Sequence, residues 1–190
     1  MIHASPALVI AGSVRPRRLA IHIAEWVAEV GRTTTDGTFE VVDLKDWPLP
    51  LDEEPGVPAA GGYEFEHTRA WSRKIAAAAA FVFVTPQYNW GYPAALKNAL
   101  DHLYREWAGK PAMIVTYGGH GGDRCAAQLR QVCEGLHMAP IVKWTGLVLS
   151  RGHIEANAGE IDPAEEFTVH LVDLRQAFRE LATARRRTAL

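Results

Sequence analysis

The sequence predicts an α/β protein in which helices cover both faces of a five-stranded parallel sheet, giving three layers. Short apolar runs alternate with amphipathic segments five times along the chain, as in repeated βα units. The apolar fraction of 48% and charged fraction of 22% are typical of a globular protein. Right-handed crossovers leave few topologies, and five strands favour the order 2-1-3-4-5. We expect a single domain over residues 1–190, with a basic tail at about 183–190.

Length, charge and cysteine content exclude several classes of protein. A chain of 190 residues with a formal net charge of −2 is neither disordered nor a collagen, and its charge gives no basis for general binding to nucleic acids or anionic membranes. Cys125 and Cys133 would lie roughly 12 Å apart along a helix, too far for a disulfide. The first residues lack a signal-peptide pattern, and the apolar runs are shorter than a membrane helix of roughly 20 residues. We expect a soluble, cytoplasmic protein with reduced thiols.

The first half of the chain contains two predicted strands and two predicted helices. Ala7–Ala11 is an apolar run that ends at a glycine, as buried parallel strands do, and Phe39–Leu44 has the pattern of a second strand. Between them, apolar residues recur at helical spacing: Leu19, Ile23, Trp26, Val27 and Val30. Residues 46–62 are rich in proline and glycine and form a long loop. Residues 64–80 form the second helix, which finishes in an alanine run.

The second half continues the alternation. Phe81–Thr85, Ala112–Tyr117 and Ile141–Leu149 are the third, fourth and fifth strands, the last one interrupted near Gly146. Pro93 suits the first position of a helix because its missing N–H would be unpaired there. Two helical stripes follow in this half: Ala95, Leu96, Ala99, Leu100, Leu103 and Trp107, and then Cys125, Leu129, Val132, Cys133 and Leu136.

The last helix has a recognisable start. Asp162 is the expected N-cap, Pro163 stands in the first turn, and Glu165 completes the spacing of a capping box. The buried stripe of this helix is expected to be Phe167, Leu171, Leu174, Phe178 and Leu181. The arginines at 185–187 fit a solvated helix end better than a binding patch.

The loop after strand one, Gly12–Arg18, indicates a phosphate site, because ligands bind beyond the carboxyl ends of such strands. Ser13 offers a hydroxyl, and Arg15 and Arg18 can bond to phosphate oxygens beside the positive end of the next helix. The alternative is an ordinary basic loop with solvated arginines. No lysine stands near Gly12, so a Walker A loop is excluded.

A dinucleotide fingerprint is excluded as well, since Gly12 is the one glycine of that pattern present. Asp43 stands where NAD domains place a ribose-binding acid, and without the glycines we interpret it as a structural loop residue. The arginine-rich loop favours a terminal phosphomonoester, as in FMN, over a pyrophosphate.

Two further loops supply groups for a flat ligand. Thr85–Pro93 sets aromatic and amide side chains between two prolines, which suits either a heteroaromatic ring or a buried aromatic corner. Residues 117–122 expose backbone N–H groups through four glycines, which suits either a flavin edge or a flexible turn. His120 is more simply a solvated histidine. The histidines are scattered, so no metal is expected, and without a GxSxG elbow or a cysteine at a helix start we expect no covalent nucleophile.

These three loops resemble the NADPH-dependent FMN reductase family over roughly residues 5–150. The matching motifs are Gly12-Ser13-x-Arg15-Pro16-x-Arg18, Thr85–Asn89 with Leu96–Asp101, and Tyr117-Gly118-Gly119-x-Gly121-Gly122 with Leu129-Arg130. The resemblance implies a flavodoxin-like fold, bound FMN, NAD(P)H as co-substrate and a homodimer or dimer of dimers. It also implies that the loop 46–62 walls the site or meets the partner subunit.

The resemblance assigns cofactor contacts to particular residues. The phosphate would be held by Ser13, Arg15, Arg18 and the amides near Leu19. The isoalloxazine ring would be lined by Pro86, Gln87, Tyr88 and Asn89 on one side and by Tyr117, Gly118, Gly119 and Gly121 on the other. The chain departs from the family at Gln87, where an acid is usual, at Arg17, where relatives often have a small residue, and at Ala20, which replaces a common glycine.

The implied activity is that of a flavin oxidoreductase. FMN would accept a hydride from NAD(P)H and pass electrons to a quinone, azo compound, free flavin or similar acceptor, with no catalytic side chain required. The alternatives are a flavodoxin-like electron carrier or a flavin-binding protein without NAD(P)H turnover. Aromatic residues around Trp90, Tyr92, Tyr104 and Trp107 are expected to pack across a dimer interface or to line a pocket within the chain. The physiological acceptor and the choice between NADH and NADPH do not follow from the sequence.

Overall fold

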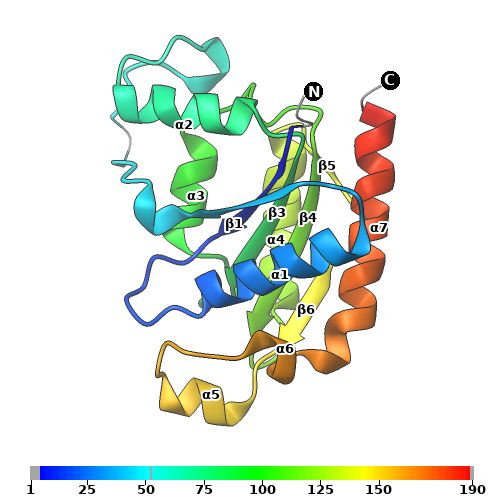
Figure 1. Cartoon of the computed structure of the whole chain (residues 1–190). Coiled ribbons are helices and arrows are strands. Elements are labelled where there is room, and N and C mark those ends of the chain that lie inside the picture. The colour runs from blue at the N-terminus through cyan, green and yellow to red at the C-terminus, as the bar shows by residue number, and fades with distance from the viewer. Residues whose placement is uncertain (1–4, 52, 189–190) are drawn as a thin grey trace.

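A central parallel sheet forms the middle of the molecule (Figure 1). The computed structural model describes residues 5–51 and 53–188. Four strands lie side by side in the order β2 (Phe39–Asp43), β1 (Ala7–Ala11), β3 (Ala80–Pro86) and β4 (Pro111–Gly118), and all of them run parallel. With β5 beside β4, this is the flavodoxin-like strand order 2-1-3-4-5 that the sequence predicts.

The fifth position of the sheet holds two short strands rather than the single strand predicted at Ile141–Leu149. β5 (Ala139–Pro140) and β6 (Thr145–Val148) both pair with β4. The Ile141 N–H still donates to the Ala112 carbonyl at 2.8 Å, and residues 142–144 leave the ladder. Side chains replace the missing ladder bonds there. Arg130 donates to the Ile141 carbonyl, and Glu180 accepts from the backbone N–H groups at 142 and 143. The interruption therefore lies before Gly146, where distant side chains satisfy the backbone.

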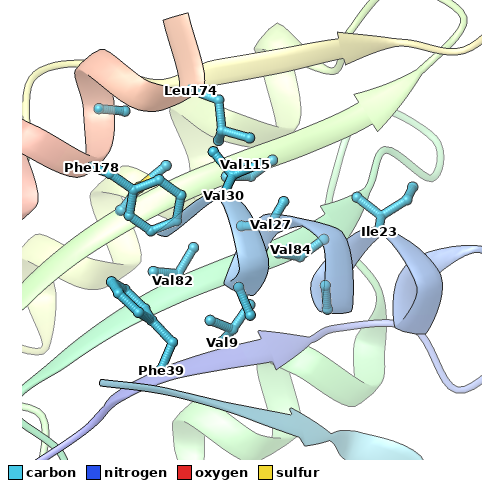
Figure 2. Packing of buried hydrophobic residues seen from close by; sticks show 14 of the residues in the cluster. Val9, Ile23, Val27, Val30, Phe39, Val82, Val84, Val115, Leu174 and Phe178 are labelled. Atoms are coloured by element: carbon cyan, nitrogen blue, oxygen red, sulfur yellow. The ribbon is translucent and has the colours of Figure 1, made fainter. Parts of the chain in front are cut away.

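Two helices cover one face of the sheet. α1 (Ala20–Thr34) and α7 (Leu171–Thr188) pack on the strand residues that point to this side. Figure 2 shows Val82 of the sheet close to Val27 of α1 and to Phe178 of α7, all of them buried. The predicted stripes of both helices thus face the core.

Three helices cover the other face of the sheet. They are α2 (Glu66–Ala76), α3 (Ala94–Asp101) and α4 (Asp123–Gly135), which pack on the alternate strand residues. Together with α1 and α7 they complete the predicted three-layer arrangement (Figure 1).

Two helices on this face end earlier than predicted. The second helix ends at Ala76, and Ala80 already belongs to β3. The Lys110 ammonium caps this end of the helix by donating hydrogen bonds to the carbonyls of Ile75 and Ala76. α3 ends at Asp101, so Trp107 lies beyond it. Trp107 is nonetheless fully buried and donates its indole N–H to the α3 carbonyl of Leu100.

The predicted last helix is divided. Asp162 caps it as expected, accepting from the N–H groups of Ala164 and Glu165, but α6 (Pro163–Glu166) is only one turn long. A 3₁₀ turn at Thr168–His170 then leads into α7. Further 3₁₀ turns at Leu44–Asp46 and Pro58–Ala60 interrupt the predicted long loop.

The predicted basic tail is part of α7 as far as Thr188, and residues 189–190 lie outside the described part of the chain. Arg185 is half-buried rather than solvated and donates to the backbone carbonyl of Ser5. Between β6 and α6 lies α5 (Arg151–Ala156), a helix that the sequence pattern does not predict. Figure 1 shows α5 beyond the carboxyl ends of β4 and β6, the edge at which ligands bind in such sheets.

Candidate functional site

The carboxyl ends of the strands surround a cavity of about 310 Å³, a size within the range of ligand pockets. It is formed by the loops after β1, β3 and β4 together with the segment around α5. Nine of the residues predicted to contact the cofactor line it: Arg15, Arg18, Leu19, Pro86, Gln87, Tyr88, Tyr117, Gly118 and Gly119. The three predicted loops therefore meet in one cavity, whereas Ser13, Asn89 and Gly121 lie outside its lining.

Arg18 lies at the β1–α1 end of this cavity and forms an ion pair with Asp43 at the end of β2. Both side chains are about nine-tenths buried. Asp43 also accepts from the Lys45 N–H, so its carboxylate fixes both the loop and the arginine, as its interpretation as a structural residue requires. The Nε of Arg18 is buried and has no hydrogen-bond partner among the residues that the structure describes. A buried N–H of this kind is costly unless an acceptor reaches it, and an anionic oxygen bound in the cavity would be such an acceptor.

Ser13 and Arg15 both contact Tyr88, which links the β1 loop to the β3 loop. The fully buried Ser13 hydroxyl lies 2.9 Å from the Tyr88 hydroxyl, and the Arg15 guanidinium lies over the Tyr88 ring with Cζ 3.7 Å from its centre. Arg15 stays at the cavity wall with its charge unpaired by any carboxylate of the described chain. The Ser13 hydroxyl is turned to the phenol rather than into the cavity, and its contact with phosphate remains a prediction.

Residues 88–91 form a tight turn at the tip of the β3 loop. Tyr88 and Gly91 exchange two backbone hydrogen bonds of 2.8 and 2.9 Å, and both central residues, Asn89 and Trp90, have positive φ angles of 48° and 71°. This is the geometry of a type I′ turn, for which the usual second residue is glycine. Trp90 is 63% exposed, and its ring is covered by the Arg124 guanidinium at 3.7 Å.

We expect Trp90→Gly to stabilise the protein by about 1 kcal/mol, because glycine adopts this left-handed conformation without strain. Part of the gain is offset by the lost contact with Arg124. Thermal unfolding measures the change, which corresponds to a rise in Tm of roughly 2–4 °C in a chain of this size. Trp90→Ala is the matched control, since it removes the ring but keeps the strained Cβ. A Gly variant no more stable than the Ala variant would contradict the strain at this turn.

Gln87 stands where the resemblance implies an acid, and its side-chain amide contacts the start of α4. Its Oε1 accepts from the Cys125 N–H at 3.1 Å, in the first turn of α4, and its own N–H donates to the Tyr117 carbonyl at 3.0 Å. The amide therefore satisfies an unpaired N–H of the helix start, which an acid in the same place would also do. Its main chain connects the start of the β3 loop to the end of β4.

Cys125 corrects one sequence expectation, because it is the third residue of α4 and so does stand at a helix start. It is not activated there. Burial raises the pKa of the Cys125 and Cys133 thiols to about 12, and both side chains are fully buried. Neither thiol is therefore a nucleophile at neutral pH.

From these pKa values we expect both native thiols to be unreactive toward a soluble disulfide reagent at pH 8, and both to react after unfolding in guanidinium chloride.

The raised folded-state pKa values also predict that stability is retained below about pH 9 and falls as the pH rises toward 12, since only the unfolded chain then releases these protons. Thermal unfolding at a series of alkaline pH values, compared with a Cys133→Ala variant, measures this loss. Reaction of either native thiol with the disulfide reagent at pH 8 would contradict the raised pKa values from which both expectations follow.

The glycines at the end of β4 and in the loop after it differ in their structural roles. Gly121 and Gly122 have positive φ angles of 74° and 84°, and the Thr116 hydroxyl donates to the Gly121 carbonyl at 2.6 Å, so this pair shapes the turn. Gly118 lines the cavity, and a Cβ placed on it would meet nothing closer than the Gln87 Cβ at 3.9 Å. The absence of side chains at this point leaves room above the strand end for a flat ring.

Tyr117 completes this wall of the cavity. It is 5% exposed, and burial raises its pKa well above the ordinary value for a phenol, so it stays neutral. Tyr117 thus adds an uncharged aromatic side chain with one hydroxyl to the lining of the cavity.

One wall of the cavity is missed by the sequence patterns. It consists of Arg17 in the β1 loop and of the segment around α5: Leu149, His153, Ile154, Asn157 and Gly159. Gly159, with φ at 84°, brings this segment against the β1 loop, since a Cβ there would lie 3.0 Å from the Arg17 Cα. The turn residues Asn157 and Gly159 are visible in the sequence, but nothing in their spacing indicates that the chain folds back over the sheet edge.

The cavity as a whole carries positive charge. Three arginines line it, and no aspartate or glutamate does so in the described chain. No group of three or more His, Cys, Asp or Glu side chains within residues 5–51 and 53–188 is arranged to hold a metal ion. Within the same residues, no helix is both long and apolar enough to cross a membrane. The arrangement suits an anionic group at the arginine end and a flat ring between the β3 and β4 loops.

Comparison with known sequences agrees with this arrangement. Residues 6–148 match the family described as NADPH-dependent FMN reductase. An NAD(P)H-dependent FMN reductase of Schizosaccharomyces pombe is 55% identical over 177 residues, which cover 92% of this chain and 88% of that protein. A quinone reductase of Escherichia coli is 30% identical over 147 residues, covering 67% of this chain and 74% of that protein.

A solved structure supports the same conclusion about the fold. FerB, a flavoenzyme NAD(P)H:(acceptor) oxidoreductase from Paracoccus denitrificans, superimposes with a TM-score of 0.69 at 18% identity, over 95% of this chain and 98% of its own. At this identity the likeness concerns the fold alone. The family match, which spans all three loops of the cavity, goes further: this chain belongs to the NADPH-dependent FMN reductase family.

Proposed function

We propose that this protein is an FMN-dependent NAD(P)H oxidoreductase that delivers electrons to a quinone. The observation that carries the proposal is the single cavity in which the arginines of the β1 loop, the Tyr88 loop and the glycines after β4 come together. Its relatives named as FMN reductases and as a quinone reductase support the same activity. Bound FMN supplies the chemistry, accepting a hydride equivalent from NAD(P)H and releasing electrons to the acceptor.

The residues of the chain bind and orient the cofactor. Arg15 and Arg18 provide the charge for the phosphate, with the backbone amide at Leu19 beside them at the start of α1. The Arg18 Nε, which has no partner within the described residues, supports this assignment because it can donate to a phosphate oxygen. Ser13, by contrast, would act through Tyr88, whose hydroxyl it contacts.

The ring is held between two loops. Pro86, Gln87 and Tyr88 form one side, with Asn89 at the tip of the turn, and the second side consists of Tyr117, Gly118, Gly119 and the turn at Gly121. The Gly121 N–H donates to the Gly118 carbonyl at 3.0 Å, so we assign the Gly119 N–H as the donor to an edge of the ring on which negative charge develops. No side chain is required to act as an acid or base toward NAD(P)H.

A quinone is the acceptor we favour among those that a flavin can reduce, and azo compounds and free flavins are the others. We also propose a cytoplasmic homodimer or dimer of dimers. Trp90 is exposed, and Tyr92 and Tyr104 are partly buried, which keeps them available for a subunit interface. Trp107 is not, because it belongs to the core.

The absorption spectrum tests the proposal. The purified protein is incubated with FMN, freed of unbound FMN, and recorded before and after anaerobic addition of NADPH and then of a quinone. We expect a flavin spectrum that NADPH bleaches and the quinone restores. A bound flavin that NADPH does not bleach would indicate an electron carrier or flavin-binding protein instead. A protein that stays colourless after FMN is added would overturn the proposal.

A further inference from the structure

His153 is a titratable side chain at the cavity that the proposed function does not use. It belongs to α5, and the segment that contains α5 lies against the end of β4 and the glycine loop. The Leu149 N–H before the helix donates to the Gly118 carbonyl, and a Cβ on Gly119 would lie 3.3 Å from the Cδ1 of Ile154 in the helix. The imidazole therefore lines the cavity from the segment that packs against the glycines that would hold the ring.

The orientation of the His153 ring is fixed from one side. Its Nδ1 lies 3.0 Å from the Ser150 hydroxyl and 3.2 Å from the Glu166 carboxylate, and the Ser150 N–H donates to the other Glu166 oxygen at 2.7 Å. Burial acts to raise the pKa of Glu166, but the bonds from Ser150 and the nearby His153 bring it below its ordinary value. An ionised carboxylate only accepts, so Nδ1 carries a hydrogen in both protonation states of the ring.

It follows that Nε2 is the atom of His153 that gains or loses a proton. Nε2 makes no hydrogen bond within the described chain. Of the other groups at the cavity, Arg15, Arg17 and Arg18 are arginines, a residue type that stays cationic in proteins, and burial raises the pKa of Tyr117. On the helix of His153, Arg151 and Glu155 pair with each other at 2.6 Å.

We propose that His153 is the proton-coupled cation of the cofactor cavity: its Nε2 binds a proton when the ring of the cofactor gains negative charge. The inference rests on the proposed function, since it requires bound FMN. Two electrons and one proton enter the ring with each hydride equivalent from NAD(P)H, which leaves one extra negative charge. A proton from solvent taken up at Nε2 balances that charge, and it leaves again when the electrons pass to the acceptor.

Proton uptake of this kind makes the cavity bind reduced FMN more tightly than oxidised FMN, in a manner that depends on pH. Histidine is the side-chain type that ordinarily changes its charge between pH 5 and 8. The cationic imidazole favours the reduced cofactor, whereas the neutral imidazole favours neither form. If His153 only linked α5 to α6, its replacement would instead lower the affinities for reduced and oxidised FMN equally at every pH.

The test measures the midpoint potential of bound FMN between pH 6 and pH 9 in the wild-type holoprotein and in His153→Asn. Asparagine keeps an N–H near the position of Nδ1 for Glu166 but lacks Nε2. We expect the wild type to prefer reduced over oxidised FMN about tenfold more than the variant at pH 6, equivalent to about 30 mV for two electrons, and we expect the two proteins to converge at pH 9. His22→Asn on α1, outside the cavity lining, is the matched control and should follow the wild type.

The other outcomes are informative in different ways. The same offset at every pH, or no offset, would overturn the role of His153 while leaving bound FMN and turnover intact. If His153→Asn lowers the affinity for oxidised FMN, its far-UV circular dichroism separates loss of structure from loss of contact, and NMR of the His153 imidazole in oxidised and reduced wild-type protein decides the proton uptake directly. A wild-type protein that binds no FMN would instead reject the proposed function itself.

Discussion

Replacing Arg18 by alanine is expected to weaken FMN binding about a hundredfold and to lower the free energy of unfolding by about 3 kcal/mol. The first effect follows from the loss of charge-assisted hydrogen bonds to the phosphate, each of which contributes roughly 1.5–3 kcal/mol. The second follows because Asp43, which is 9% exposed, would keep its charge without a partner. Fluorescence titration with FMN and denaturant unfolding of the cofactor-free protein measure the two effects separately.

A second substitution separates the two roles of Arg18. In Arg18→Ala/Asp43→Asn the stranded carboxylate is gone, so most of the lost stability should return, whereas the affinity for FMN should not. Riboflavin, which lacks the phosphate, is the matched ligand, and its affinity should change by no more than a few-fold in either variant. Equal losses for riboflavin and FMN would show that Arg18 shapes the ring site rather than the phosphate site.

The sheet and the three loops of the cavity were predictable because local patterns encode them. Runs such as Ala7–Ala11 are continuously apolar since both faces of a parallel strand are buried, and the burial of every residue in β1 confirms it. Once the strand order is fixed, Arg18, Tyr88 and Gly118 must come to one edge of the sheet, whatever their separation along the chain. Resemblance to the family then gave the ligand that such an edge would hold.

The remaining features depend on contacts between distant residues, which no local pattern carries. The break between β5 and β6 is stabilised by Arg130 and by Glu180, which lies 38 residues after Val142. The ion pair between Arg18 and Asp43 joins residues that are 25 positions apart, and no local pattern predicts it. The wall around His153 exists because Gly159 allows one loop to touch another. The sequence therefore predicts many of the groups that line the cavity but not how these groups restrain one another.

A leucine at Gly118 is expected to abolish measurable FMN binding, a loss of a hundredfold or more, while changing stability by no more than about 1 kcal/mol. Gly118 does not have a positive φ angle, and its Cβ would meet only the Gln87 Cβ at 3.9 Å, so the backbone accepts a side chain there. The longer side chain then fills the space above the end of β4 that the ring would occupy. Titration with FMN and thermal unfolding of the same preparation measure both quantities.

The series Gly118→Ala, Gly118→Val and Gly118→Leu should lose affinity in steps as the added volume grows, because steric exclusion increases with size and backbone strain does not. Gly135→Leu is the matched control, since a Cβ at that position has no neighbour within 4 Å and lies at the far end of α4 from the first turn that Gln87 caps. An unchanged affinity in Gly118→Leu would place the ring elsewhere. In that case the arginines of the β1 loop would hold an anion whose remaining part does not reach the glycine loop, and the cavity would have to be assigned to a different ligand.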